Sequence, residues 1–139
     1  MIANAWEGDW PVSQHFGARY DYYWQNFGLP GHEGLDIAIP QGVRVRAQES
    51  GEVVEVGLAP THPYGYYVKI RTPDGADWLW AHLLPYDLPR PGTWLGSGAP
   101  HGWTGASGNI QGVHLHLGFR PRFWERFHHD GWRDPLPLL

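Results

Sequence analysis

Short segments of alternating apolar and polar residues, separated by glycine and proline, constrain this fold more than any other feature. The segment at 43–47 (VRVRA) follows the period of two that β-strands show, and 51–57 (GEVVEVG) follows it after a short link. The segment at 65–72 (GYYVKIRT) is rich in aromatic and β-branched residues. Two further predicted strands are 76–82 (ADWLWAH), which returns after the turn TPDG, and 112–119 (GVHLHLGF). Tight turns such as TPDG separate neighbouring segments. The sequence therefore predicts an all-β domain with antiparallel strands.

Two long segments rich in glycine and proline interrupt this pattern. Residues 18–31 are predicted to form a loop. Residues 88–112 are too many for a structureless loop in a compact domain, so we expect short strands around Trp94 and Trp103. The segment 122–129 (RFWERFHH) is predicted to form a helical turn or two. The expected architecture is a compact antiparallel β-sheet or sandwich-like domain. Long loops line a groove in it, and helix is limited to a short C-terminal turn.

Composition narrows the classes of function. The chain has 139 residues, and no linker or repeat divides it, so we expect a single domain over residues 1–139. The formal net charge is −4 with one lysine, which gives no support for nucleic-acid binding. No segment is long enough to insert in a membrane, and the N-terminus does not resemble a signal peptide. The chain has no cysteine, so any metal must be bound by His, Asp or Glu.

His114 and His116 flank Leu115 in the last predicted strand. Because side chains alternate between the two faces of a strand, both imidazoles project from one face, about 7 Å apart along it. A shared metal site suits this arrangement. A row of polar, solvent-facing side chains suits it equally, and the strand by itself does not distinguish the two interpretations.

A second motif, GHEGLDIAIP, places His32 and Asp36 four residues apart with Gly34 between them. Imidazole and carboxylate are both good zinc ligands. The spacing His-x-x-x-Asp also arises often by chance. Glu33 is a competing ligand, although in an extended segment it would point away from Asp36.

His82 ends the apolar strand segment WLWAH. A lone histidine in that position is more often a hydrogen-bonded structural residue than a catalyst. Considered together, however, the three motifs supply what a catalytic zinc site requires. They offer three protein ligands, a position left for water, and additional imidazoles that handle protons.

The order and spacing of these motifs resemble the lysostaphin-type, or LytM-type, zinc endopeptidases, which cut peptide cross-links in bacterial peptidoglycan. The resemblance begins at PVSQHFG (11–17) and includes the H-x-x-x-D segment with the hairpin that follows (31–57). It continues through YGYYVKIRTPDG and WAHL. It then includes the T-G-x-S-G turn and the H-x-H signature, both within 102–119. Most of the chain is covered, and the resemblance implies the LytM (duplicated hybrid motif) type of β fold.

The resemblance also implies a role for each histidine of the motifs. It implies one Zn²⁺ ion with three protein ligands: His32, Asp36 and His116. It implies two catalytic histidines that do not bind the metal: His82 and His114. The two histidines of the H-x-H signature would therefore have different functions.

Departures from the family pattern lie mainly in the loops. Val113 stands where a proline is usual, the loop at 88–102 is short, and the loop at 18–31 is long and aromatic. These departures concern substrate preference and leave the chemistry intact. Three side chains in or beside the groove loops are our candidates for substrate binding: Tyr23, Asn26 and Tyr66.

The function implied is that of a zinc metalloendopeptidase that hydrolyses peptide cross-links or stem peptides of peptidoglycan. We expect a monomeric catalytic domain with no separate cell-wall-binding domain, acting on the wall extracellularly or in the periplasm. Without a signal peptide, delivery would be that of a phage lysin, a virion-associated enzyme or a processed fragment of an exported protein. The alternatives are a non-catalytic zinc-binding wall module, a structural or regulatory virion domain, and a zinc hydrolase of other peptides. The complete ligand set favours the enzyme.

Overall fold

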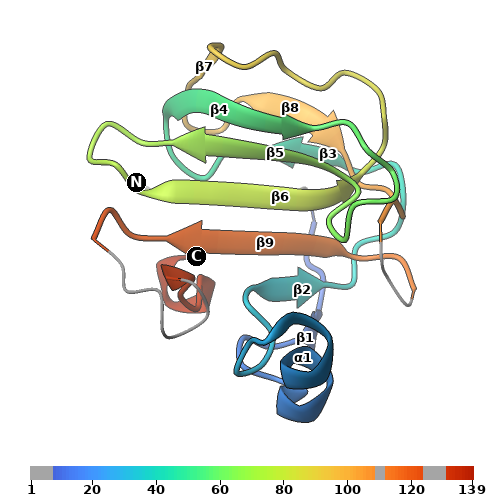
Figure 1. Cartoon of the computed structure of the whole chain (residues 1–139). Helices are drawn as coiled ribbons and strands as arrows, with labels where there is room; N and C mark the ends of the chain where they lie inside the picture. Colours follow the sequence, from blue (N-terminus) through green and yellow to red (C-terminus); the bar gives the residue numbers. More distant parts are fainter. Residues whose placement is uncertain (1–7, 109–111, 124–130) are drawn as a thin grey trace.

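The computed structural model describes residues 8–108, 112–123 and 131–139, which form two layers of antiparallel strands (Figure 1). The larger layer is a seven-stranded sheet with the strand order β1-β2-β9-β6-β5-β4-β7. The smaller layer is the pair β3–β8. The prediction of an antiparallel, mostly β domain is confirmed.

The strands agree closely with the segments that the sequence predicts. The large sheet contains β1 (Val12–Gln14), β2 (Leu35–Ile37), β4 (Gly51–Gly57), β5 (Tyr66–Arg71), β6 (Asp77–Leu83), β7 (Trp94–Leu95) and β9 (Leu115–Arg120). The small sheet contains β3 (Arg44–Arg46) and β8 (Pro100–Trp103). The last two strands before β9, β7 and β8, are the short strands expected within the long glycine-rich segment.

The structure differs from the prediction at 18–31, where an α-helix, α1 (Tyr20–Phe27), replaces part of the expected loop. Gly28 ends the helix in the left-handed conformation, and its N–H donates to the carbonyl of Trp24. None of the helix residues is buried. Its aromatic residues Tyr20, Tyr23, Trp24 and Phe27 do have the i, i+3, i+4, i+7 spacing of a helix, but the segment is only eight residues long. Aromatic residues favour strands, and glycine and proline follow closely, which is why the segment was predicted to be a loop.

The predicted helical turn at 122–129 falls largely outside the described residues. Further along, the described C-terminal segment contains a 3-10 helix at Leu136–Leu138.

The hydrophobic core lies between the large sheet and the β3–β8 pair. It includes Leu115 and Leu117 of β9, Trp78 and Trp80 of β6, and Val45 of β3, all inaccessible to solvent. Each such side chain contributes about 1.5–3 kcal/mol relative to an exposed one. The alternation of β9 turns His114 and His116 away from this core. The opposite face of the large sheet is therefore available for a site.

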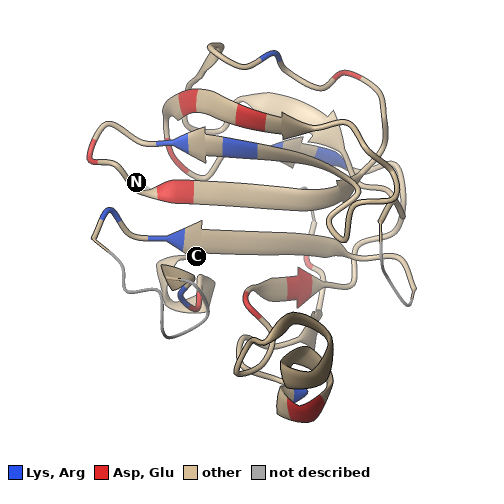
Figure 2. Ribbon diagram, viewed as in Figure 1, with Lys and Arg blue, Asp and Glu red and all other residues tan. Residues whose placement is uncertain are grey.

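Charged residues of both signs are distributed along the strands and loops of the described residues (Figure 2). Neighbouring strands share ion pairs, such as the one that joins Lys69 Nζ of β5 to Glu55 Oε2 of β4 at 2.9 Å. In the part of the chain that the structure describes, no helix is long and apolar enough to span a membrane.

Candidate metal centre

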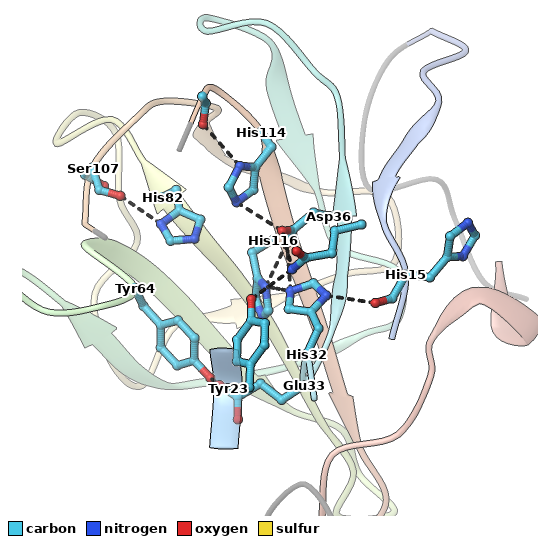
Figure 3. Close-up of polar contacts among 12 residues, drawn as sticks. His15, Tyr23, His32, Glu33, Asp36, Tyr64, His82, Ser107, His114 and His116 are labelled. Carbon is cyan, nitrogen blue, oxygen red and sulfur yellow. Dashed lines mark hydrogen bonds and ion pairs between the residues drawn. The ribbon is translucent and has the colours of Figure 1, made fainter. Parts of the chain in front are cut away.

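Three side chains converge where β2 and β9 pair, with Asp36 directly opposite His116 in the register (Figure 3). His32 Nε2 lies 3.1 Å and His116 Nδ1 lies 3.0 Å from Asp36 Oδ1. The two ring nitrogens are 3.1 Å apart. Ligand atoms around a tetrahedral zinc ion are separated by about 3.3–3.4 Å, given zinc–ligand bonds of about 2.0–2.1 Å. The triangle therefore has the size and the donor chemistry that one zinc ion requires.

Local packing holds these three side chains in place, and all three are buried. His32 Nδ1 lies 3.2 Å from the backbone carbonyl of His15. In the tautomer that donates this hydrogen bond, Nε2 keeps its lone pair directed at the triangle. Gly34 has no space for a side chain, because a Cβ there would lie 2.6 Å from His116 Cε1. The glycine between the two ligands thus allows the His116 ring to reach its position.

The ionisation of Asp36 favours cation binding. Burial opposes the charged form, but hydrogen bonds from His116 and His32 outweigh it and hold the pKa of the Asp36 carboxyl well below its usual range. Asp36 is thus already ionised beside the two imidazoles, and a metal ion can bind without first displacing a proton from the carboxyl group.

Two further histidines lie beside the triangle without belonging to it. The ring centroids of His82 and His114 are 4.8 Å apart, and His114 Nε2 lies 3.4 Å from Asp36 Oδ2. Each Nδ1 faces a backbone carbonyl, that of Ser107 at 2.8 Å for His82 and that of Gly112 at 3.2 Å for His114. In the tautomers that donate from Nδ1, both Nε2 atoms are free to accept a proton.

The surroundings keep this pair neutral. Burial lowers the pKa of His82 to about 3, and the neighbouring His116 and His114 contribute to the shift. Burial also lowers the pKa of His114. Neutral imidazoles are the form that can take a proton from a reacting group.

The triangle and the pair open into one cleft of about 350 Å³. Tyr23 lines it from α1, with its ring centroid 5.4 Å from that of His32. Its hydroxyl oxygen accepts a hydrogen bond of 2.8 Å from Gln14 Nε2. Burial raises the pKa of Tyr23 to about 12, so the hydroxyl keeps its proton and can donate it in a hydrogen bond.

The model of a known family, described as Peptidase family M23, matches residues 30–127, which is more than half of the chain. This chain belongs to peptidase family M23. Lysostaphin from Staphylococcus staphylolyticus is 30% identical to the M23 chain over 123 residues, which cover 86% of this chain and 25% of lysostaphin. The DD-carboxypeptidase/endopeptidase Mpg from Neisseria meningitidis serogroup B is 33% identical over 105 residues, which cover 76% of this chain and 23% of Mpg.

The M23 chain thus spans about a quarter of the length of these curated relatives. Among solved structures, the catalytic domain of lysostaphin from Staphylococcus simulans has the same fold, with a TM-score of 0.75 at 24% sequence identity. The superposition covers 93% of this chain and 91% of that one.

The M23 fold gathers some of the sequence-predicted site residues and leaves others apart. His32, Asp36, His82, His114, His116 and Tyr23 all line the one cleft. Asn26 lies on the exposed side of α1 and donates from Nδ2 to the carbonyl of Tyr22, and Tyr66 packs against the core. Neither of them is among the described residues that line the cleft, and their role in substrate binding stays a prediction.

Sequence reasoning missed several contributors to the cleft, among them Gln14, which lines the cleft and contacts Tyr23. The only signal for it was the alternation of the segment PVSQHFG, which becomes β1. Its contact with a helix that the sequence did not predict could not be foreseen.

Proposed function

We propose that this M23 chain is a zinc-dependent endopeptidase that hydrolyses peptide cross-links or stem peptides of bacterial peptidoglycan. One observation carries the proposal, namely that a buried His-Asp-His triangle and a neutral pair of histidines share a single cleft. The names of its relatives, lysostaphin and a DD-carboxypeptidase/endopeptidase, support a peptide substrate of the cell wall. The site of action would be the wall, outside the cytoplasmic membrane.

In this proposal His32 Nε2, Asp36 Oδ1 and His116 Nδ1 hold one zinc ion. When bound, zinc makes a water molecule more acidic and polarises the scissile carbonyl. Either His114 or His82 would accept the proton of that water at Nε2 and pass it to the departing amine. The Tyr23 hydroxyl donates a hydrogen bond to the carbonyl oxygen as negative charge develops on it.

The structural roles of these side chains follow from their neighbours. The backbone carbonyl of Ser107 orients the His82 ring, and Gln14 orients the Tyr23 hydroxyl. Burial of the cleft floor excludes water from these hydrogen bonds and strengthens them.

Digestion of purified peptidoglycan tests the proposal. The zinc-loaded protein should lower the turbidity of a wall suspension, a chelator should stop the decrease, and added zinc should restore it. Mass spectrometry of the released fragments should show cleavage at peptide bonds, and it would identify which bond is cut. A turbidity that never falls, in a protein that carries about one zinc per chain, would contradict the peptidase function. Binding to the wall without release of fragments would indicate the non-catalytic wall module instead.

A further inference from the structure

A second carboxylate, that of Glu33, lines the cleft beside the metal centre without belonging to it. It follows His32 in the sequence, and its Oε1 accepts a hydrogen bond from the hydroxyl of Tyr64 (Figure 3). The Tyr64 ring centroid lies 5.4 Å from that of His116. Glu33 and Tyr64 thus form a polar pair in the wall of the cleft, one side chain away from the ligand triangle.

This carboxylate has no cation to neutralise it in the described part of the chain, where none of the ion pairs includes Glu33. Arg19 also lines the cleft, but its guanidinium lies 4.4 Å from the centre of the Tyr22 ring. Asp36, the other carboxylate in the cleft, faces three histidines. The negative charge of Glu33 is therefore available to attract a positively charged group of a ligand that enters the cleft.

The hydrogen bond to Tyr64 satisfies only part of what a carboxylate can accept. Its two oxygens offer about four acceptor positions, and Tyr64 occupies one of them. Glu33 is partly buried, so water reaches it less freely than it reaches a surface carboxylate. An ammonium group has several donors and a full positive charge, and its hydrogen bonds to a carboxylate are about twice as strong as neutral ones.

We propose that Glu33, held in place by Tyr64, binds a primary ammonium group of the peptide substrate close to the cleaved bond. The inference rests on the proposed peptidase function and adds a preference to it. Peptides with a free amine are better substrates than the same peptides with that amine acylated. The amine is either the N-terminal α-amine of the peptide or the side-chain amine of a diamino acid.

Matched synthetic peptides test this preference in the zinc-loaded chain. Each peptide is prepared with the amine free and with the amine acetylated, in one set at the N-terminus and in a second set on a diamino acid side chain. In one of the two sets we expect kcat/KM to be about tenfold higher for the free amine, mainly through KM. The set that shows the difference identifies the amine.

The variant Glu33→Gln keeps the shape and an acceptor for Tyr64 but removes the charge, so the ratio between the two peptides should fall to about one. The matched control is Asp21→Asn, which removes an exposed carboxylate of α1 that does not line the cleft. This control should keep the wild-type ratio. Equal cleavage of free and acetylated peptides by the wild type in both sets, or an unchanged ratio in Glu33→Gln, would overturn the proposal.

Peptide binding separates this inference from the function on which it rests. Calorimetry with the zinc-loaded His114→Ala variant measures the same preference without cleavage, and we expect the free amine to bind about tenfold more tightly. A preference in binding together with no cleavage by the wild type would contradict the peptidase function and support the amine site. Cleavage together with equal binding of the free and acetylated peptides would support the peptidase function and contradict the amine site.

Discussion

At the scale of single residues, the two histidines of the H-x-H signature stand two positions apart and have different partners. His116 Nδ1 belongs to the ligand triangle, whereas His114 Nε2 approaches the outer oxygen of Asp36. Both face the same cleft because of the period of two in a strand. The difference between them comes from the position of β2, which places Asp36 opposite His116 and not opposite His114.

Replacing each histidine in turn should separate metal binding from proton transfer. We expect His116→Ala to lose zinc and activity together, because one of three protein ligands is missing. His114→Ala should retain about one zinc per chain and lose activity by a factor of about 10²–10⁴. Elemental analysis and the peptidoglycan assay measure the two effects. His15→Ala, which removes an exposed ring outside the cleft, should change neither, and loss of zinc from His114→Ala would contradict the assignment.

Gly34→Ala should weaken metal binding although glycine offers no ligand. The added Cβ would lie 2.6 Å from His116 Cε1 and 2.7 Å from Nε2, so the ring must move. Displaced ligands typically cost about 10–100-fold in metal affinity. Competition with a metal-binding dye measures this change. Gly96→Ala is the matched control, because nothing lies within 4 Å of a Cβ at Gly96, and an equal loss of affinity there would contradict the steric argument.

At the scale of elements, the turn between β8 and β9 positions His82. Ser107 Oγ donates to the carbonyl of Leu83 at 2.7 Å and accepts from the N–H of Tyr66 at 2.9 Å. The carbonyl of Ser107 in turn lies 2.8 Å from His82 Nδ1. The backbone of His82 has a φ of 62°, in the left-handed region. A non-glycine strand residue keeps a positive φ only when its surroundings hold it there. The hydrogen bond to the Ser107 carbonyl is one contact that holds His82 in this conformation.

Ser107→Ala should therefore lower kcat while zinc stays bound. Both Oγ hydrogen bonds disappear, the turn loosens, and the His82 ring is less well aligned, which we expect to reduce kcat about tenfold with little change in KM. Ser107→Thr keeps the hydroxyl and should recover most of the rate. Ser97→Ala is the matched control, because Ser97 is exposed, does not line the cleft, and likewise donates from Oγ to a backbone carbonyl, that of Gln48 at 3.2 Å. A uniform loss of stability without a selective effect on kcat would show that Ser107 is merely structural.

The elements that could be predicted from the sequence are those with a local signal. The β4 and β5 segments are rich in β-branched or aromatic residues and have glycine at their ends, so their strands were predicted almost to the residue. The helix α1 lacks a buried face, and its aromatic residues are typical of strands, so it was not predicted. The candidate ligands were implied by the family resemblance, but the contact of Glu33 with Tyr64 joins residues 31 positions apart through two loops. No spacing rule encodes such a contact.

At the scale of the whole molecule, two titratable side chains of the described residues are buried well away from the site, namely Asp77, which pairs with arginines, and His101 of β8. Its ring centroid lies 4.3 Å from that of Trp80, and neither ring nitrogen has a hydrogen-bond partner in the described part of the chain. Burial lowers the pKa of His101 to about 3. The group therefore stays neutral in the folded protein at pH values where the unfolded chain binds a proton.

The free energy of unfolding should consequently decrease as the pH falls. The contribution of His101 is complete above its unfolded pKa of about 6.5 and is lost progressively as the pH approaches its folded pKa, at up to about 1.4 kcal/mol per pH unit. His101→Leu removes this linkage and an unsatisfied polar group. Urea unfolding between about pH 7 and pH 5, with chelator in every sample, should show a shallower decrease for this variant. His15→Leu should keep the wild-type slope, and parallel slopes for wild type and His101→Leu would contradict the prediction.

The floor and one wall of the cleft come from different kinds of element. Its floor is the paired strands β2 and β9, whose register also sets the core contacts, whereas one of its walls is a helix with no residue in the core. The wall is therefore separable from the scaffold. A different segment grafted between the fixed points at Arg19 and Gly28 would change which peptides are retained, while the floor would keep its shape and its metal-binding capacity. Because α1 also carries Tyr23, such a graft would have to keep that tyrosine, and we then expect the peptide selectivity to change while the stability of the sheet does not.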